Sequence, residues 1–98
     1  MNIFELIKED YDVRRLRNRC NYKDCDRYPS KEILIYETDF KKIKTRDLVS
    51  LYLCIKHFKE ANENLIKKLS EIEVKDKRID VRVSDLGFRY IRGSSSTR

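Results

Sequence analysis

The sequence predicts a single small α+β domain, and three observations lead to this fold class. Residues 33–38 and 48–53 are rich in β-branched and aromatic side chains, which is typical of two strands. An amphipathic helix is indicated by apolar residues that recur at steps of three and four, namely Phe58, Ala61, Leu65, Leu69 and Ile72. The chain has 98 residues, which suits one domain near the lower limit for a self-sufficient core.

Further elements are expected on both sides of this centre. A short amphipathic N-terminal helix is predicted by Ile3, Phe4, Leu6, Ile7 and Tyr11. Residues 79–84 alternate between apolar and polar side chains, so they predict a third strand with one buried face. We expect residues 1–93 to form the domain and residues 94–98 to form a flexible tail.

An alternative interpretation of the centre is a single long helix. Thr45 would act as its N-cap, and the helix would run over residues 46–72, because Leu48, Leu51 and Ile55 also fit a helical period. We prefer a strand followed by a helix. One long helix would leave the strand at 33–38 without a partner.

All three cysteines and the only histidine fall into one spaced pattern. Cys20 and Cys25 form C-x4-C, a 28-residue gap follows, and Cys54 and His57 form C-x2-H. Zinc in structural sites takes four tetrahedral thiolate and imidazole ligands, and two close pairs are the usual way in which small domains supply them. The pattern therefore predicts one structural zinc ion.

The spacing within each pair has a physical reason, because both donor atoms must reach one ion. Asn21 and Asp24 favour a tight turn between Cys20 and Cys25, and an i, i+3 pair such as Cys54 and His57 lies on one face of a helical turn. This is the treble-clef arrangement of knuckle, β-hairpin and helix, here with an N-terminal helix and an extra C-terminal strand. Two alternatives stay open: a Cys20–Cys25 disulfide, and cysteines that are simply buried apolar side chains.

The residues around the four ligands resemble a known group of proteins. Residues 20–27 and 53–58, CNYKDCDR and LCIKHF, are similar to the C-x4-C…C-x2-H knuckle of small zinc proteins from phages, prokaryotes and archaeal viruses. Some of these knuckles are fused to His-Asn-His endonucleases. The resemblance implies zinc ligation by Cys20, Cys25, Cys54 and His57 and a nucleic-acid context. It covers only the middle of the chain, and the central gap here is long enough for a full β-hairpin.

The positive net charge of the chain predicts an anionic partner. The formal net charge is +6 and the pI is about 9.3, which favours nucleic acid, and DNA over RNA, ahead of an acidic protein. One candidate phosphate-binding cluster precedes the knuckle, and a second occupies the predicted hairpin connection; together they comprise Arg14, Arg15, Arg17, Arg19, Lys41, Lys42, Lys44 and Arg46. The first cluster could equally be a solvated helix face, and a charged, solvated loop is the more frequent explanation of the second. Residues 88–92 interleave Phe88 and Tyr90 with Arg89 and Arg92, which fits either base stacking or core packing.

Catalysis is not expected. A zinc ion with four protein ligands has no open position, and using the sole histidine as a ligand removes the commonest general base. The chain has only two glycines and no glycine-rich phosphate loop. We therefore expect a non-catalytic accessory or regulatory nucleic-acid-binding factor in the cytoplasm, or the host cytoplasm if viral, without a membrane span. The alternative is a zinc-stapled protein-interaction module, such as a homodimer that pairs through its N-terminal helix.

Overall fold

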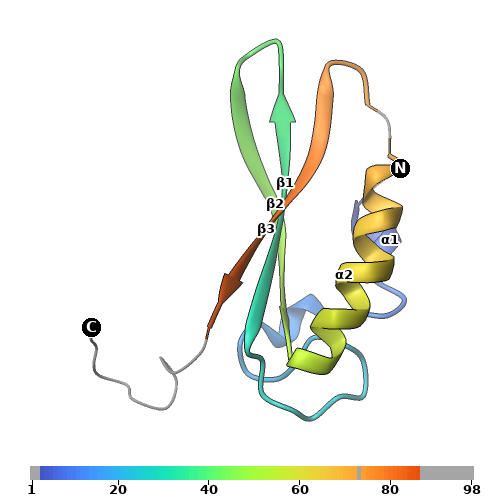
Figure 1. The fold of residues 1–98 in the computed structure, drawn as a ribbon, viewed down its shortest axis with the longest axis vertical. Helices are drawn as coiled ribbons and strands as arrows, with labels where there is room; N and C mark the ends of the chain where they lie inside the picture. Colours follow the sequence, from blue (N-terminus) through green and yellow to red (C-terminus); the bar gives the residue numbers. More distant parts are fainter. Residues whose placement is uncertain (1–2, 73, 87–98) are drawn as a thin grey trace, which may run out of the picture.

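Three antiparallel strands and one long helix form the body of the molecule. The computed structural model describes residues 3–72 and 74–86. Within them the order is α1 (Ile3–Ile7), η1 (Val13–Arg15), β1 (Lys31–Asp39), β2 (Lys44–Leu53), α2 (Ile55–Ser70) and β3 (Lys77–Asp85), as Figure 1 shows. The strand order is β2-β1-β3. The predicted α+β class and all three predicted strands are confirmed.

The β1–β2 hairpin forms two of the three strands of the sheet. It pairs Lys31 with Leu53 at one end and Asp39 with Lys44 at the other. The register shifts where Ile35 faces Val49 and Tyr36 faces Asp47, so Leu48 is the extra residue of a β-bulge. The strands extend the predicted ones by several residues, because lysines and threonines at the outer end pair in the ladder although their composition does not favour a strand.

Helix α2 covers one face of the sheet (Figure 1). Its Ala61, Leu65 and Leu69 are buried, and they belong to one core cluster with Ile33 and Leu51 from the two hairpin strands. Cys54 is the N-cap of α2, so the helix starts directly after β2. The long-helix alternative from residue 46 is therefore wrong, because residues 44–53 complete the ladder that β1 needs.

The N-terminal helix is shorter than its apolar pattern suggests. Helix α1 ends at Ile7, and Tyr11 instead forms an isolated antiparallel bridge with Tyr22. Ile3 and Ile7 are buried in the same core cluster as Leu65 and Leu69, so α1 closes the core on the side of α2. Phe4 remains 47% exposed.

Strand β3 pairs with β1 over its full length, but its predicted buried face is only half-buried. Ile79 and Val81 pack against the core, whereas Val83 is 44% exposed. An edge strand has one neighbour, and here the helices cover it less completely than they cover β1. Leu86 directly after it is buried. The predicted tail and the predicted stacking residues at 88–92 lie outside the described residues.

The two ends of the sheet differ in character. Cys54 follows Leu53 at one end, and the hairpin connection at residues 40–43 lies at the other (Figure 1). The intervening length of β1 corresponds to about 26 Å at about 3.3 Å per residue. Among the described residues, no helix combines the length and the apolar character that a membrane crossing requires.

Candidate metal centre

The first pair of predicted ligands lies on a tight turn. The Cys25 amide donates to the carbonyl oxygen of Tyr22 at 3.1 Å, and the Cys20 amide donates to the carbonyl oxygen of Arg27 at 2.7 Å. Asp24 adopts a positive φ of 67°, which short polar residues tolerate better than most. These bonds fold residues 20–25, the knuckle, so that both thiols are buried and face the same point.

The second pair comes from the start of α2. Cys54 has an extended conformation as the N-cap, and its side chain makes no capping hydrogen bond, so the thiol is available to a ligand. The Phe58 amide donates to the Cys54 carbonyl at 2.8 Å and closes the first helical turn, on which His57 lies.

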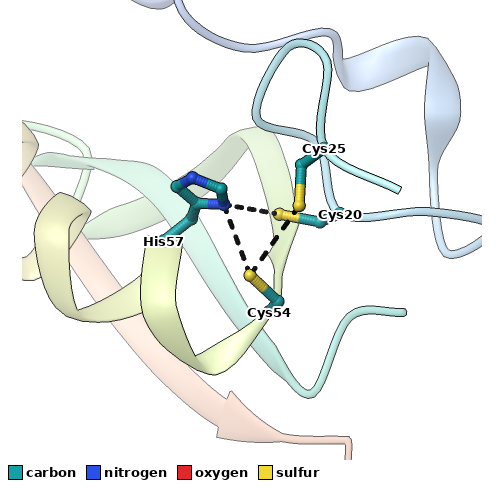
Figure 2. A group of neighbouring side chains, drawn as sticks. All are labelled: Cys20, Cys25, Cys54 and His57. Carbon is teal, nitrogen blue, oxygen red and sulfur yellow. Dashed lines mark hydrogen bonds between the residues drawn. The ribbon is translucent and has the colours of Figure 1, made fainter. Parts of the chain in front are cut away.

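The four side chains converge on one point, as Figure 2 shows. His57 Nδ1 lies 3.5 Å from Cys20 Sγ and 3.3 Å from Cys54 Sγ, and Cys25 Sγ lies 4.0 Å from Cys54 Sγ. All four ligand atoms lie within 4.8 Å of one another. The three cysteines are free thiols, so the structure contains no disulfide between Cys20 and Cys25.

These separations match those of a tetrahedral site. Zinc–sulfur bonds of about 2.3 Å and zinc–nitrogen bonds of about 2.0 to 2.1 Å imply sulfur–sulfur edges of about 3.8 Å and sulfur–nitrogen edges of about 3.5 Å. The observed 4.0, 3.5 and 3.3 Å fall close to those edges. The Cys3His group can therefore hold one metal ion without rearrangement of the backbone.

Protonation of the four ligands follows from burial and local hydrogen bonds. Burial lowers the pKa of His57, which keeps the imidazole neutral and its Nδ1 lone pair available. Burial raises the pKa of the Cys20 thiol to about 12 in the metal-free chain. For Cys25, desolvation is outweighed by hydrogen bonds from the Arg27 backbone and the neighbouring thiols, so its pKa is lowered. A bound divalent cation would supply the charge that makes Cys20 a thiolate.

Arg15, the last residue of η1, forms hydrogen bonds with the backbone of the knuckle. Its Nη1 donates to the carbonyl oxygens of Cys20 at 2.9 Å, Tyr22 at 3.3 Å and Cys25 at 2.6 Å. These contacts gather three carbonyl groups of the turn around one guanidinium. Arg15 was predicted to belong to a phosphate-binding cluster, and no signal in the sequence separated it from the neighbouring arginines.

Two knuckle residues that were not predicted as site residues also organise the centre. The Tyr22 ring stacks on the His57 imidazole with centroids 4.0 Å apart and planes inclined by 9°, which fixes the imidazole orientation. Asn21 is fully buried. Its amide nitrogen donates to the carbonyls of Leu16 and Arg19, and its Oδ1 accepts from the Tyr52 amide. Asn21 therefore ties the knuckle to β2.

Comparison with other proteins adds no assignment to this geometry. No family model, no curated protein and no solved structure matches the chain.

The four arginines of the first predicted nucleic-acid cluster have different environments. Arg14 pairs with Asp12 at 3.1 Å, and Arg15 is used by the knuckle. The guanidinium carbon of Arg17 lies 5.5 Å from the Tyr52 ring centroid, and that of Arg19 lies 4.7 Å from the Tyr28 ring centroid. Arg14, Arg17 and Arg19 remain exposed beside the metal centre.

The second predicted cluster lies at the far end of the sheet. Lys41, Lys42, Lys44 and Arg46 are all exposed there. Arg46 pairs with Glu37 at 3.4 Å, and Lys41 lies 3.9 Å from Asp76. The structure therefore places the two clusters at opposite ends of the molecule and does not bring them together.

Proposed function

We propose that this chain is a small structural-zinc protein of treble-clef type that binds nucleic acid, with DNA favoured, as a non-catalytic accessory or regulatory factor. The metal part is supported by the Cys3His geometry, since the donors suit zinc and leave no position for a substrate. The order of knuckle, hairpin and helix supports the treble-clef assignment. Zinc would connect the knuckle to the start of α2 and hold the small core together.

The observation that carries the binding part is the exposed basic end of the β1–β2 hairpin. Four exposed basic side chains lie on one narrow ribbon, namely Lys41, Lys42, Lys44 and Arg46, and residues 39–46 contain one acidic side chain, Asp39. Asp39 is itself occupied, because its Oδ1 accepts from the amides of Lys41 and Lys42 at 3.0 and 3.1 Å. A ribbon of this charge favours phosphate contacts.

The proposal is tested by salt-dependent binding of labelled duplex DNA. Wild-type protein should bind at low salt, and replacing Lys41, Lys42 and Lys44 with Glu should weaken binding across sequences. If all three lysines contact phosphates, their loss should reduce the slope of log K against log salt by about 0.9 for each contact. The matched charge-reversal control replaces three exposed lysines of α2 with Glu, namely Lys59, Lys67 and Lys68. Unchanged affinity in the hairpin variant would refute this binding surface.

Charge changes at Arg17 and Arg19 test the second cluster separately. Arg15 must stay intact in these variants, because its hydrogen bonds to the knuckle would confound a loss of binding with a loss of metal. Double replacement of Arg17 and Arg19 with Gln should lower affinity while metal content stays at its wild-type value. An effect on metal content would show that these arginines support the fold instead.

A specific observation favours the interaction-module alternative. Beside α1 lies a groove of about 490 Å³ whose apolar lining includes Ile3, Phe4, Leu48, Ile72 and Ile79. A second copy that covered this groove would make the chain a zinc-stapled homodimer. Sedimentation across a concentration series separates the two functions: a dimer that Phe4→Asp dissociates, together with no DNA binding at low salt, would support the module.

A further inference from the structure

The connection of the β1–β2 hairpin carries two exposed apolar side chains among its lysines. The hairpin tip, residues 40–43, contains Phe40, which is 54% exposed, and Ile43, which is 88% exposed. Isolated apolar side chains on a surface are common, but two at the end of a projecting basic ribbon form a distinct feature. In Figure 1 the connection extends away from both α1 and α2.

The tip has a defined conformation. The Phe40 amide donates to the carbonyl oxygen of Asp76 at 2.9 Å, and Asp39 Oδ1 accepts from the amides of Lys41 and Lys42. The Arg78 guanidinium lies 5.4 Å from the Phe40 ring centroid and holds that ring against the base of the tip. Ile43 is thus exposed on a tip whose conformation is held by these hydrogen bonds and by the Arg78 contact.

Ile43 occupies a backbone conformation that its side chain disfavours. Its φ is 53°, in the left-handed region, where a β-branched residue is an outlier and Asn or Gly would be more stable. Burial does not offset the free-energy cost of this left-handed conformation, since Ile43 is the most exposed of the large apolar side chains in the part of the chain that the structure describes. A contact between the Ile43 side chain and a binding partner would offset this cost.

We propose that the hairpin tip enters a groove of duplex DNA and inserts Ile43 as a wedge between base pairs, which kinks the duplex. This inference rests on the proposed function and specifies its ligand. Minor-groove proteins commonly insert Phe, Leu, Ile or Met between base steps, with basic side chains on the flanking phosphates. Lys41, Lys42 and Lys44 surround Ile43 in the same way. Residues 39–46 carry four basic side chains and one acidic side chain, which complements phosphate.

Duplex DNA fits the tip better than a lipid surface. Membrane association of a peripheral segment scales with buried apolar area, and the tip offers only Phe40 and Ile43, of which Phe40 is partly covered by Arg78. A two-stranded ribbon, with strands about 4.8 Å apart, is an element that DNA-binding proteins place in the major or the minor groove. The apolar end and the lysines then contact the base steps and the phosphates, respectively.

Energy transfer between fluorophores at the two ends of a duplex of about two helical turns tests the wedge. Wild-type protein at saturation should shorten the end-to-end distance. Ile43→Asn removes the apolar side chain and suits the left-handed φ, so it should leave the tip folded. We expect this variant to bind on the order of ten-fold more weakly, to keep the wild-type salt slope, and to lose the shortening. Val83→Thr, at an exposed strand position near the other end of the sheet, is the control.

The outcomes distinguish the inference from the function on which it rests. Wild-type binding without shortening, or shortening that Ile43→Asn preserves, would overturn the wedge and leave DNA binding intact. Absence of DNA binding at low salt would remove both. A parallel measurement uses vesicles of phosphatidylserine and phosphatidylcholine. Retention of the wild type that Ile43→Asn abolishes, without any bending of DNA, would assign the tip to an anionic membrane and overturn the proposal.

Discussion

Arg15 Nη1 lies 2.6 Å from the carbonyl oxygen of Cys25, and the same nitrogen reaches the carbonyl of Cys20. One guanidinium thereby joins the backbone at both ligands of the knuckle. Because Arg15 holds the carbonyl groups of Cys20 and Cys25, it fixes the path of the chain between the two thiols. Arg15 is therefore a positioning residue for the candidate metal centre.

The first prediction concerns Arg15. Arg15→Lys keeps the charge but replaces the guanidinium, whose Nη1 reaches three carbonyl oxygens, with an ammonium on a shorter side chain. Metal affinity should therefore fall by about 10- to 100-fold, as for other groups that orient ligands. Competition with a chromogenic chelator measures this change. Arg14→Lys is the control, because Arg14 contacts Asp12 and not the knuckle. Equal affinities for the two variants would show that Arg15 does not position the ligands.

The second prediction concerns Asn21. Asn21→Ala leaves the Tyr52 amide and the carbonyls of Leu16 and Arg19 without their side-chain partner. We expect a loss of about 2 to 3 kcal/mol in the free energy of unfolding, measured by urea denaturation of the metal-loaded protein. Asn18→Ala, at an exposed position in the same segment, should change stability by less than about 0.5 kcal/mol. Equal effects would refute the bridging role.

The third prediction is a loss of stability at alkaline pH through Tyr11. Burial, with the negative charge of Asp10 adding to it, raises the pKa of Tyr11 from 10.0 to about 12. A raised pKa in the folded state stabilises the fold below pH 10, and this contribution disappears as the pH rises from 10 toward 12.

Melting temperatures of the wild type and Tyr11→Phe across this range measure the effect. The wild type should lose stability more steeply than Tyr11→Phe, whereas Tyr28→Phe, at a position that is 74% exposed, should follow the wild type. Parallel curves for all three proteins would contradict the assignment to Tyr11.

The fourth prediction is that metal removal unfolds the domain. Structural zinc contributes on the order of 10 kcal/mol in small finger domains, which is comparable to the whole stability of an ordinary domain. Chelation, or Cys54→Ser, should therefore abolish the cooperative thermal transition, and adding zinc should restore it only in the wild type. Circular dichroism on heating follows both. If a cooperative thermal transition remained after verified metal removal, the core around Ile33 and Leu51 would be stable without the metal ion, which would contradict the prediction.

The parts of the fold that repeat a simple pattern were predicted from the sequence. The helix after Cys54 and the strand around Val81 follow apolar periodicity, and the strands around Ile33 and Leu51 follow their β-branched and aromatic composition. The convergence of the four ligands follows from close spacing within each pair. The extension of β2 before Leu48, over residues 44–47, was not predicted, because pairing with β1 and a bulge decide it. The exposure of Val83 depends on how far α2 covers the edge strand, which no local pattern specifies.

The residues that surround the four ligands could not be predicted from the sequence either. Arg15 and Arg14 are adjacent and chemically identical in the sequence, yet one binds the knuckle carbonyls and the other pairs with Asp12. The stacking of Tyr22 on His57 joins residues that are far apart in the chain. Such long-range contacts depend on the final packing and leave no spacing signal.

Native mass spectrometry of the purified protein, prepared without added metal, tests the central claim most directly. We predict one zinc ion per chain, seen as the mass increase of one bound Zn²⁺, and loss of that ion in Cys20→Ser, Cys25→Ser, Cys54→Ser and His57→Ala. A metal-free chain that does not take up zinc, or one whose mass shows a Cys20–Cys25 disulfide, would contradict the account.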